Sequence, residues 1–288
     1  MLSTTGSATL PELLPLKEVV ARYGLTPQRA LGQHFLFDSS ITDRIAAAAG
    51  DITDCVVYEV GPGPGGLTRS LLAAGARKLI VCESDQRAIA ALDELSKAHP
   101  GRMRILATDA MTVNEAHFCI AGTKIVANLP YNISTALLLK WLKDAKRFAS
   151  MTLMFQKEVA LRICAEPGTA DYGRLSVMTQ WLCEAKRVFD VQAGSFVPPP
   201  KVTSSVVSIV PRAEPLAPAR RDYLERITAA AFGQRRKMLR QALKTLGTNT
   251  DVLIERAQVT PTARGEELTV AQFCALAREF QILTGARF

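Results

Sequence analysis

The chain lacks the features that define several large classes of protein. No run of eighteen apolar residues occurs in its 288 residues, which excludes a hydrophobic membrane-spanning helix. The first sixteen residues contain no Lys or Arg, so they resemble neither a secretory signal peptide nor an arginine-rich transit peptide. Apolar residues make up 48% and charged residues 22%, which excludes a disordered, collagen-like or coiled-coil protein. We therefore expect a globular protein with no membrane partner.

Residues that bind metals are few and scattered. The six cysteines form no CxxC pair, and the three histidines lie far apart along the chain. No zinc-binding spacing can be drawn from them, so we expect no metal. Scattered cysteines of this kind are typical of reduced thiols in a core, which predicts a cytoplasmic protein.

Charge is unevenly distributed. Lys and Arg number 35 against 27 Asp and Glu, yet residues 51–130 are nearly balanced, with eight basic and nine acidic residues. Residues 220–244 hold eight basic residues and only two acidic ones. Such a basic segment suggests a polyanionic partner. A solvated helix face would explain the same charges equally well.

Short apolar runs alternate with helical patterns over the first two thirds of the chain. Helical spacing occurs at 66–74, 86–98 and 133–146, between strand-length runs at 56–60, 78–82, 103–107, 124–127 and 151–155. This alternation predicts a doubly wound, mostly parallel α/β sheet of the Rossmann-like type. Two later runs, 187–191 and 204–210, would complete seven strands, the last one being a candidate for antiparallel pairing.

The composition changes near residue 211. Residues 211–220 are rich in Pro, Ala and Arg and are interpreted as a linker, and beyond them only helical patterns occur, at 224–232, 236–246 and 270–284. We therefore predict two domains: an α/β domain over 1–211, with an N-terminal extension over 1–30, and a small all-helical domain over 212–288.

A glycine-rich turn follows the first predicted strand. The sequence Gly61-Pro62-Gly63-Pro64-Gly65-Gly66 lets backbone amides approach a ligand at the start of a helix. Because it also fits the dinucleotide pattern, a dehydrogenase stays an alternative at this point.

Three acidic residues lie at or near the ends of neighbouring predicted strands. Glu83 could accept both hydroxyls of a ribose with either cofactor. Glu59, two residues before the first glycine, suits a cationic amino-acid group, and Asp109 could receive the amino group of an adenine. Together these residues favour S-adenosylmethionine over a dinucleotide.

The fourth strand ends in Asn128-Leu129-Pro130-Tyr131. Acceptors on the Asn128 side chain and the Leu129 carbonyl would hold both hydrogens of an exocyclic amine and aim its lone pair at a methyl group. Tyr131 would stack on the base, which must leave its helix to enter. The alternative interpretation is a strand-to-helix turn with a capping Asn.

Taken together, the motifs resemble those of the ribosomal RNA small-subunit adenine dimethyltransferases. The matching pieces occur in the order of that family and are 31–36 (LGQHFL), 59–66 (EVGPGPGG), Glu83, Asp109-Ala110, 128–131 (NLPY), 196–202 (FVPPPKV) and 232–237 (FGQRRK). The resemblance implies S-adenosylmethionine against Gly61 and Gly63, with Glu59, Glu83 and Asp109 as further ligands. It also implies that His34 and Leu36 close over the cofactor and that Asn128 bridges cofactor and target amine. Many family members have Asn at the position of His34, and both side chains can form hydrogen bonds.

Two further segments could contact RNA. Phe196, before the stiff run Pro198–Pro200, could stack on the second face of the flipped base with Lys201 near a phosphate, although a core-packed Phe in a rigid connector is the simpler interpretation. Arg236 and Arg240 would share one helix face with Lys244, flanked by Arg235 and Lys237, and we predict that this face contacts RNA phosphates.

The resemblance implies dimethylation of two adjacent adenosines in the 3′-terminal hairpin of small-subunit (16S) ribosomal RNA within an assembling 30S subunit. We expect a monomer. The first alternative is the related family that dimethylates large-subunit RNA and confers macrolide resistance. The second is a non-catalytic assembly or transcription factor on the same fold.

Overall fold

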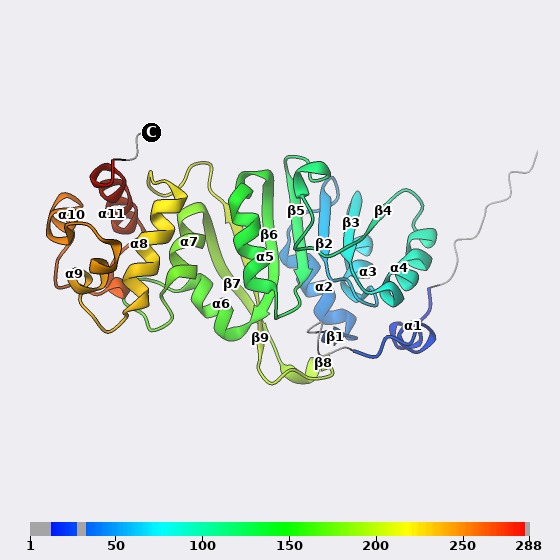
Figure 1. Cartoon of the computed structure of the whole chain (residues 1–288). Coiled ribbons are helices and arrows are strands. Elements are labelled where there is room, and N and C mark those ends of the chain that lie inside the picture. Colours follow the sequence, from blue (N-terminus) through cyan, green and yellow to red (C-terminus); the bar gives the residue numbers. More distant parts are fainter. Residues whose placement is uncertain (1–12, 28–32, 286–288) are drawn as a thin grey trace, which may run out of the picture.

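The computed structural model of the chain describes residues 13–27 and 33–285. A seven-stranded sheet, in the order β4-β3-β2-β5-β6-β9-β7, runs through its larger part (Figure 1). The strands are β2 (Val56–Val60), β3 (Lys78–Glu83), β4 (Met103–Ala107), β5 (Thr123–Asn128), β6 (Phe148–Gln156), β7 (Cys183–Val191) and β9 (Ser204–Pro211). The first five pair in parallel, whereas β9 is antiparallel to both of its neighbours. The predicted fold class is confirmed.

One predicted strand was too short. The sequence placed it at 187–191, but β7 begins at Cys183, because its whole length pairs with β9 at the edge of the sheet. Most of β7 is at least partly exposed, so its first half lacks the continuous apolar run that marks the buried strands.

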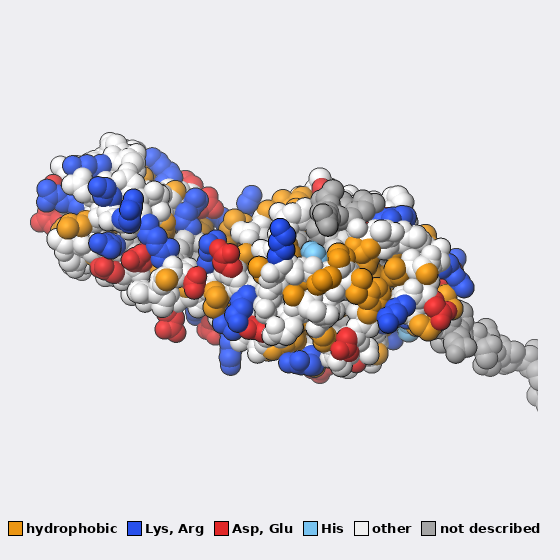
Figure 2. Space-filling view, turned by 90° about the horizontal axis from the view of Figure 1, so that it is seen from below, with side chains coloured by type: hydrophobic (Ala, Val, Ile, Leu, Met, Phe, Trp, Pro, Cys, Tyr) orange, Lys and Arg blue, Asp and Glu red, His pale blue; other side chains and the backbone are white. Residues whose placement is uncertain are grey.

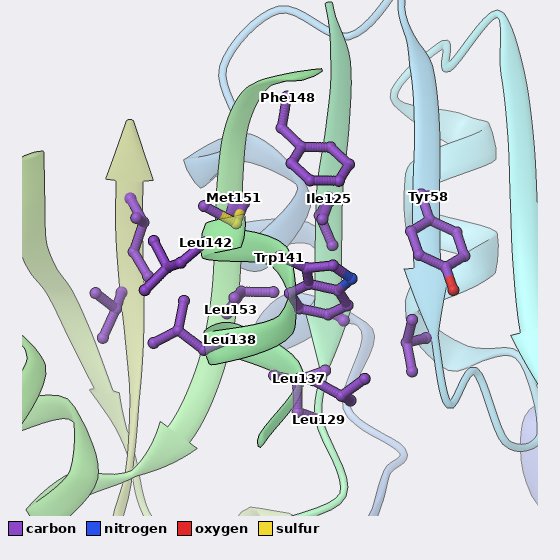
Figure 3. Close-up of a cluster of buried hydrophobic side chains, with 14 of the residues drawn as sticks. Tyr58, Ile125, Leu129, Leu137, Leu138, Trp141, Leu142, Phe148, Met151 and Leu153 are labelled. Atoms are coloured by element: carbon purple, nitrogen blue, oxygen red, sulfur yellow. The ribbon is translucent and has the colours of Figure 1, made fainter. Parts of the chain in front are cut away.

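Helices cover both faces of the sheet. One face carries α2 (Ser39–Ala48), α3 (Gly66–Ala73) and α4 (Gln86–Ala98), and the other carries α5 (Ser134–Trp141), η3 (Leu142–Arg147), α6 (Lys157–Cys164) and α7 (Arg174–Leu182). Trp141 of α5 packs on the sheet beside Tyr58 of β2, with ring centroids 6.4 Å apart (Figure 3). This packing fixes α5, whose first turn follows the Asn128–Tyr131 segment.

A small two-stranded sheet lies beside the main one. In it β1 (Phe35–Leu36) pairs antiparallel with β8 (Phe196–Val197), which follows η4 (Ala193–Ser195). The helix α1 (Leu16–Arg22) packs through Val19 against Phe35 and α4. The first two residues of the LGQHFL motif, Leu31 and Gly32, lie outside the described residues.

Helices form the C-terminal part of the chain (Figure 1). They are α8 (Arg221–Gly233), α9 (Leu239–Ala242), η5 (Leu243–Leu246), α10 (Thr250–Arg256), η6 (Gly265–Glu267) and α11 (Val270–Leu283). Their core also includes Val177 and Trp181 of α7, and the Trp181 indole donates a hydrogen bond to the carbonyl of Ala217. The boundary expected after residue 211 coincides with the end of β9 and stays a prediction, since α7 shares this core. No helix of the described ranges is both long and apolar enough to cross a bilayer.

The helix predicted over 236–246 is wrong in its first turn. Helical structure begins only at Leu239, and residues 234–238 form a turn in which the amide of Lys237 donates to the carbonyl of Gln234. The amide of Leu239 donates to the carbonyl of Ala263, a distant partner that ends the helical pattern on this side. Arg236 therefore does not share a helix face with Arg240.

Candidate active site

A pocket opens where the carboxyl ends of β2, β3 and β5 meet the segment that leads into β1. Eight of the residues predicted from the sequence as cofactor or catalytic groups line it together with Leu129 and Tyr131: His34, Leu36, Glu59, Gly61, Gly63, Glu83, Asp109 and Asn128. Residues from five separate sequence motifs are thus brought to one place, as expected for the strand ends of a doubly wound sheet.

The glycine turn forms the floor of the pocket. Gly61 and Gly63 have φ angles of 68° and 54°, which side chains with a Cβ rarely adopt. A Cβ on Gly63 would lie 3.0 Å from the Phe35 ring, and one on Gly61 would lie 3.2 Å from Pro130. The turn therefore presents bare backbone to the pocket, and any side chain there would collide with its walls.

Glu59 is a buried carboxyl group at the pocket, with 1% of its surface exposed. Burial raises its pKa to about 8, although the Thr68 hydroxyl, which donates a 2.8 Å hydrogen bond to Oε2, acts in the opposite direction. A cationic group in the pocket would stabilise the ionised form of Glu59, because it would compensate for the hydration that the carboxylate loses on burial.

Glu83 is also buried but is surrounded by donors. The backbone amides of Gly63, Ser84 and Asp85 donate hydrogen bonds of 2.8–3.1 Å to its carboxylate. Burial raises its pKa, and these three amides oppose the rise. The carboxylate is thereby held in one orientation with lone pairs left for a further donor, such as a hydroxyl group.

Asp109 follows the end of β4 and lines the pocket. Its side chain is exposed and its Oδ1 accepts a hydrogen bond from the amide of Met111. The carboxylate therefore lines the pocket while remaining available to a donor on a ligand.

The turn after β5 is fixed on several sides. The Asn128 Nδ2 donates to the backbone oxygen of His34 at 3.3 Å, and the Tyr131 hydroxyl bonds the Ser204 hydroxyl. The Ser134 hydroxyl donates to the Tyr131 carbonyl at the start of α5. Since Nδ2 of Asn128 is used in this way, its Oδ1 is the atom of that amide left to accept a hydrogen bond.

His34 touches the residues expected to bind the target base. Its ring stacks on Tyr131 with centroids 5.4 Å apart, and its Nδ1 lies 2.8 Å from the Pro198 carbonyl oxygen. Leu36, by contrast, is buried beside the glycine turn and the core of α2 and α3. Of the two residues expected to cover the cofactor, His34 thus contacts the base-binding groups as well.

Phe196 does not line the pocket. Its ring is 1% exposed and packs in the core with Leu36 and Ile45, as in the simpler interpretation of the sequence. Its edge faces the His34 ring, with centroids 6.5 Å apart. In this conformation the ring offers no face to a base, so the stacking role would require the loop of β8 to move, and it stays a prediction.

The five residues predicted to contact RNA lie outside the pocket. Arg235 is engaged: it donates to Glu266 at 2.8 Å and to the carbonyls of Thr169 and Ala170. Arg240 pairs with Asp251 at 3.3 Å. Arg236, Lys237 and Lys201 are exposed, and within the described chain they form no ion pair.

Sequence reasoning missed Thr68 and Ser204, which contact Glu59 and Tyr131. Ser204 is 73 residues from its partner, so no local pattern could have identified it. Thr68 lies only nine residues after Glu59, one turn into the helix that follows the glycines, and its hydroxyl was a signal that could have been used. Across 13–27 and 33–285, no group of three or more His, Cys, Asp or Glu is arranged to hold a metal ion.

Comparison with known proteins identifies a family model and several relatives that match most of the chain. The family model described as ribosomal RNA adenine dimethylase matches residues 25–282. A ribosomal RNA small subunit methyltransferase A from Paramagnetospirillum magneticum is 59% identical over 275 residues, covering 96% of this chain and 98% of that protein. The protein of the same name from Rhodospirillum rubrum is 54% identical and covers 92% of both chains.

Two solved structures share most of the architecture. A dimethyladenosine transferase from Plasmodium falciparum superposes with a TM-score of 0.76 at 27% identity, covering 87% of this chain and 98% of that one. The 23S rRNA methyltransferase ErmE superposes with a TM-score of 0.65 at 29% identity, covering 86% and 99%.

Proposed function

Because the chain belongs to the ribosomal RNA adenine dimethylase family, we propose that it dimethylates N6 of two adjacent adenosines in the 3′-terminal hairpin of small-subunit ribosomal RNA. The substrate is this RNA within an assembling 30S subunit, and S-adenosylmethionine is the methyl donor. We further propose that the enzyme acts as a monomer in the cytoplasm and uses no metal.

The residues of the pocket fit this cofactor. The buried Glu59 suits the ammonium of the methionine portion, the fixed Glu83 suits the ribose hydroxyls, and Asp109 suits the adenine amino group. The bare backbone at Gly61 and Gly63 admits the chain of the ligand between these groups. When bound, S-adenosylmethionine supplies a methyl group on a sulfonium, which is electrophilic without an acid catalyst.

The proposed way of holding the target amine rests on Asn128. Its Nδ2 is held by the His34 carbonyl, which directs Oδ1 as an acceptor. Oδ1 and the Leu129 carbonyl can each take one hydrogen of an adenine amino group, so that the nitrogen lone pair is directed at the methyl carbon. In the transfer, the C–N bond would form as the S–C bond breaks, and the proton that the nitrogen loses for each methyl group would pass to solvent.

Tyr131 provides the stacking surface for the base. Its hydroxyl is fixed by Ser204, so the ring is held in one plane before any RNA arrives. A flipped adenine must unstack from the RNA to reach this ring, and stacking on it offsets part of that energy.

The exposed Arg236 and Lys237 are the proposed contacts to RNA phosphates in the C-terminal part. Figure 2 shows Lys and Arg side chains gathered over these helices, on the side of the molecule seen from below in Figure 1. Phosphate contacts place a protein on RNA without reading its sequence. This surface would therefore position the substrate, while the pocket performs the reaction.

The alternatives are less well supported. Identity to the small-subunit enzymes reaches 59%, whereas the 23S rRNA methyltransferase is 29% identical. The presence of Gly61, Glu83, Asp109, Asn128 and Tyr131 at the pocket argues against a non-catalytic assembly or transcription factor on this fold. A dehydrogenase is excluded by the family.

The test is mass spectrometry of ribosomal RNA from a strain that lacks the protein. We expect dimethyladenosine to be missing from the small-subunit RNA, to return with the wild-type gene and to stay missing with Asn128→Ala. Small-subunit RNA that keeps its dimethyladenosine in the deletion strain would contradict the proposal, and loss from large-subunit RNA instead would favour the first alternative.

A further inference from the structure

A buried ion pair lies behind the adenine side of the pocket and outside the groups used so far. Glu115, in the short helix η2 (Glu115–His117), is 8% exposed. One oxygen, Oε1, accepts hydrogen bonds from Lys140 Nζ and from the indole nitrogen of Trp141, both at 2.8 Å. Lys140 Nζ also donates to the carbonyl of Ala110 at 2.7 Å. Lys140 is thus the link between Glu115 and Ala110.

The bonds of Lys140 act on the segment that carries Asp109. Before Asp109, the amide of Thr108 is held by the carbonyl of Glu83. After it, the carbonyl of Ala110 is held by Lys140, while the contacts of the Asp109 side chain are local, to the amide of Met111. The position of the exposed Asp109 carboxylate therefore depends on the backbone around it. Lys140 fixes this backbone at the carbonyl of the next residue, Ala110.

The same helix touches the methyl-transfer turn. Lys140 and Trp141 are in the last turn of α5, whose first turn is bonded to Tyr131 through Ser134. Trp141 is 1% exposed and packed on the sheet, as Figure 3 shows, so α5 has little freedom to move. One rigid helix thereby joins the adenine segment at one end to Asn128–Tyr131 at the other.

We propose that Glu115 and Lys140 are positioning residues for the cofactor, which hold Asp109 where it can accept the amino group of the adenine. This rests on the proposed function, in that the adenine of S-adenosylmethionine is placed at Asp109. Neither residue touches the cofactor: Lys140 acts through the Ala110 carbonyl, and Glu115 acts by fixing the ammonium of Lys140. The alternative is that the pair only stabilises the fold.

A pair of ligands separates these two roles. S-adenosylhomocysteine has the adenine amino group, and its 6-deamino analogue, with hydrogen in that place, does not. Calorimetric dissociation constants for both should show that the wild-type protein prefers S-adenosylhomocysteine by roughly tenfold or more, since a hydrogen bond to a charged acceptor is lost in the analogue. Lys140→Met should lose most of this preference, and Glu115→Gln should lose part of it, because the neutral amide can still accept from Trp141.

The matched control is Lys157→Met, which breaks the 2.7 Å ion pair of Lys157 with Asp190 in a different part of the sheet. It should keep the wild-type preference even where its melting temperature falls. If Lys140→Met and Glu115→Gln lower the melting temperature but keep the full preference, the pair is structural only and the inference is wrong. If Lys140→Met does not fold, Glu115→Gln alone decides. A wild-type protein that binds neither ligand would instead contradict the proposed function.

Discussion

Glu59 and Glu83 place two buried carboxyl groups in one pocket, but their surroundings differ. Three backbone amides donate to Glu83, whereas Glu59 receives one bond from the Thr68 hydroxyl. Fixed backbone dipoles therefore stabilise the ionised form of Glu83. The ionised form of Glu59 lacks such dipoles and would be stabilised mainly by a positive charge on a ligand. Both residues were predicted from the sequence as ligands, Glu83 from its place after a strand and Glu59 from its place two residues before the first glycine. It could not predict the pKa of Glu59, which depends on burial by segments far apart in the chain.

The contribution of Glu59 to the stability of the ligand-free protein should fall as pH rises from about 4.5 to about 8. Over this range Glu59 is protonated in the folded chain and ionised in the unfolded chain, so the folded state binds more protons and loses stability as pH increases. Thermal unfolding of the wild-type protein and of Glu59→Gln at several pH values measures this. The slope should be smaller in Glu59→Gln, and equal slopes would show that Glu59 does not titrate in this range.

Binding of S-adenosylhomocysteine should release a proton near pH 7. The ammonium group of the ligand favours the ionised form of Glu59, so the carboxyl that is protonated in the free protein must lose its proton on binding. Calorimetry in two buffers of different ionisation enthalpy reports the number of protons released. We expect a release in the wild-type protein that is absent in Glu59→Gln, and affinity that rises with pH up to about 8. Proton uptake would contradict the assignment.

Asn128→Ala should reduce methyl transfer far more than it reduces binding of the subunit. In the proposed mechanism the side chain directs the amine, an interaction that matters most in the transition state. Single-turnover transfer and equilibrium binding on subunits from a strain lacking the enzyme separate the two effects. Tyr131→Phe, which keeps the ring and loses only the bond to Ser204, is the control and should keep substantial activity. Normal transfer by Asn128→Ala would exclude the proposed chemistry.

At the scale of elements, the buried parallel strands were predictable and the last basic segment was not. Strands such as β2 are buried along their whole length and are mostly apolar, because helices cover both faces of the sheet. The 236–246 segment has good helical spacing, yet its first residues form a turn, because Leu239 and Arg235 bond to distant parts of the chain. Periodicity reports what a segment can form alone and cannot include such partners.

The turn at 234–238 predicts different results for neighbouring basic residues. Replacing Arg236 and Lys237 together by Gln should weaken subunit binding without changing the melting temperature, since neither residue has an ion pair in the described chain. Each lost phosphate contact should also lower the slope of log affinity against log salt by roughly 0.7–0.9. Binding across a salt series measures this, and parallel slopes would show that these residues do not touch phosphate.

Arg235→Gln is the matched comparison. Its exposed guanidinium bonds Glu266, Thr169 and Ala170, so its loss should destabilise the protein by up to about 1 kcal/mol. Denaturant unfolding measures the change. Unchanged stability in Arg235→Gln would return this residue to the set of free phosphate contacts that the sequence predicted.

For the whole molecule, the two predicted domains are not independent in their packing. Val177 and Trp181 of α7 belong to the core of the C-terminal helices, although α7 lies within residues 1–211. A chain that ends at residue 211 should therefore expose these side chains and fail to fold as a stable monomer. Sedimentation and near-ultraviolet circular dichroism of that fragment, compared with the full chain, measure the outcome. A fragment that is monomeric, with the near-ultraviolet spectrum of a packed protein, would show that the boundary after 211 separates autonomous domains.

Arg235 fastens the turn of Arg236 and Lys237 to the loop before α7, and thereby to the sheet. If Arg236 and Lys237 bind phosphates as proposed, the distance from those phosphates to Asn128 is therefore set mainly by the fold of the protein. An enzyme of this kind would select its adenosine by the distance between the base and the bound phosphates, and the identity of the nucleotides between them would not matter. Lengthening the hairpin stem would change this distance for the normal target adenosines, and we expect methylation of different nucleotides or of none.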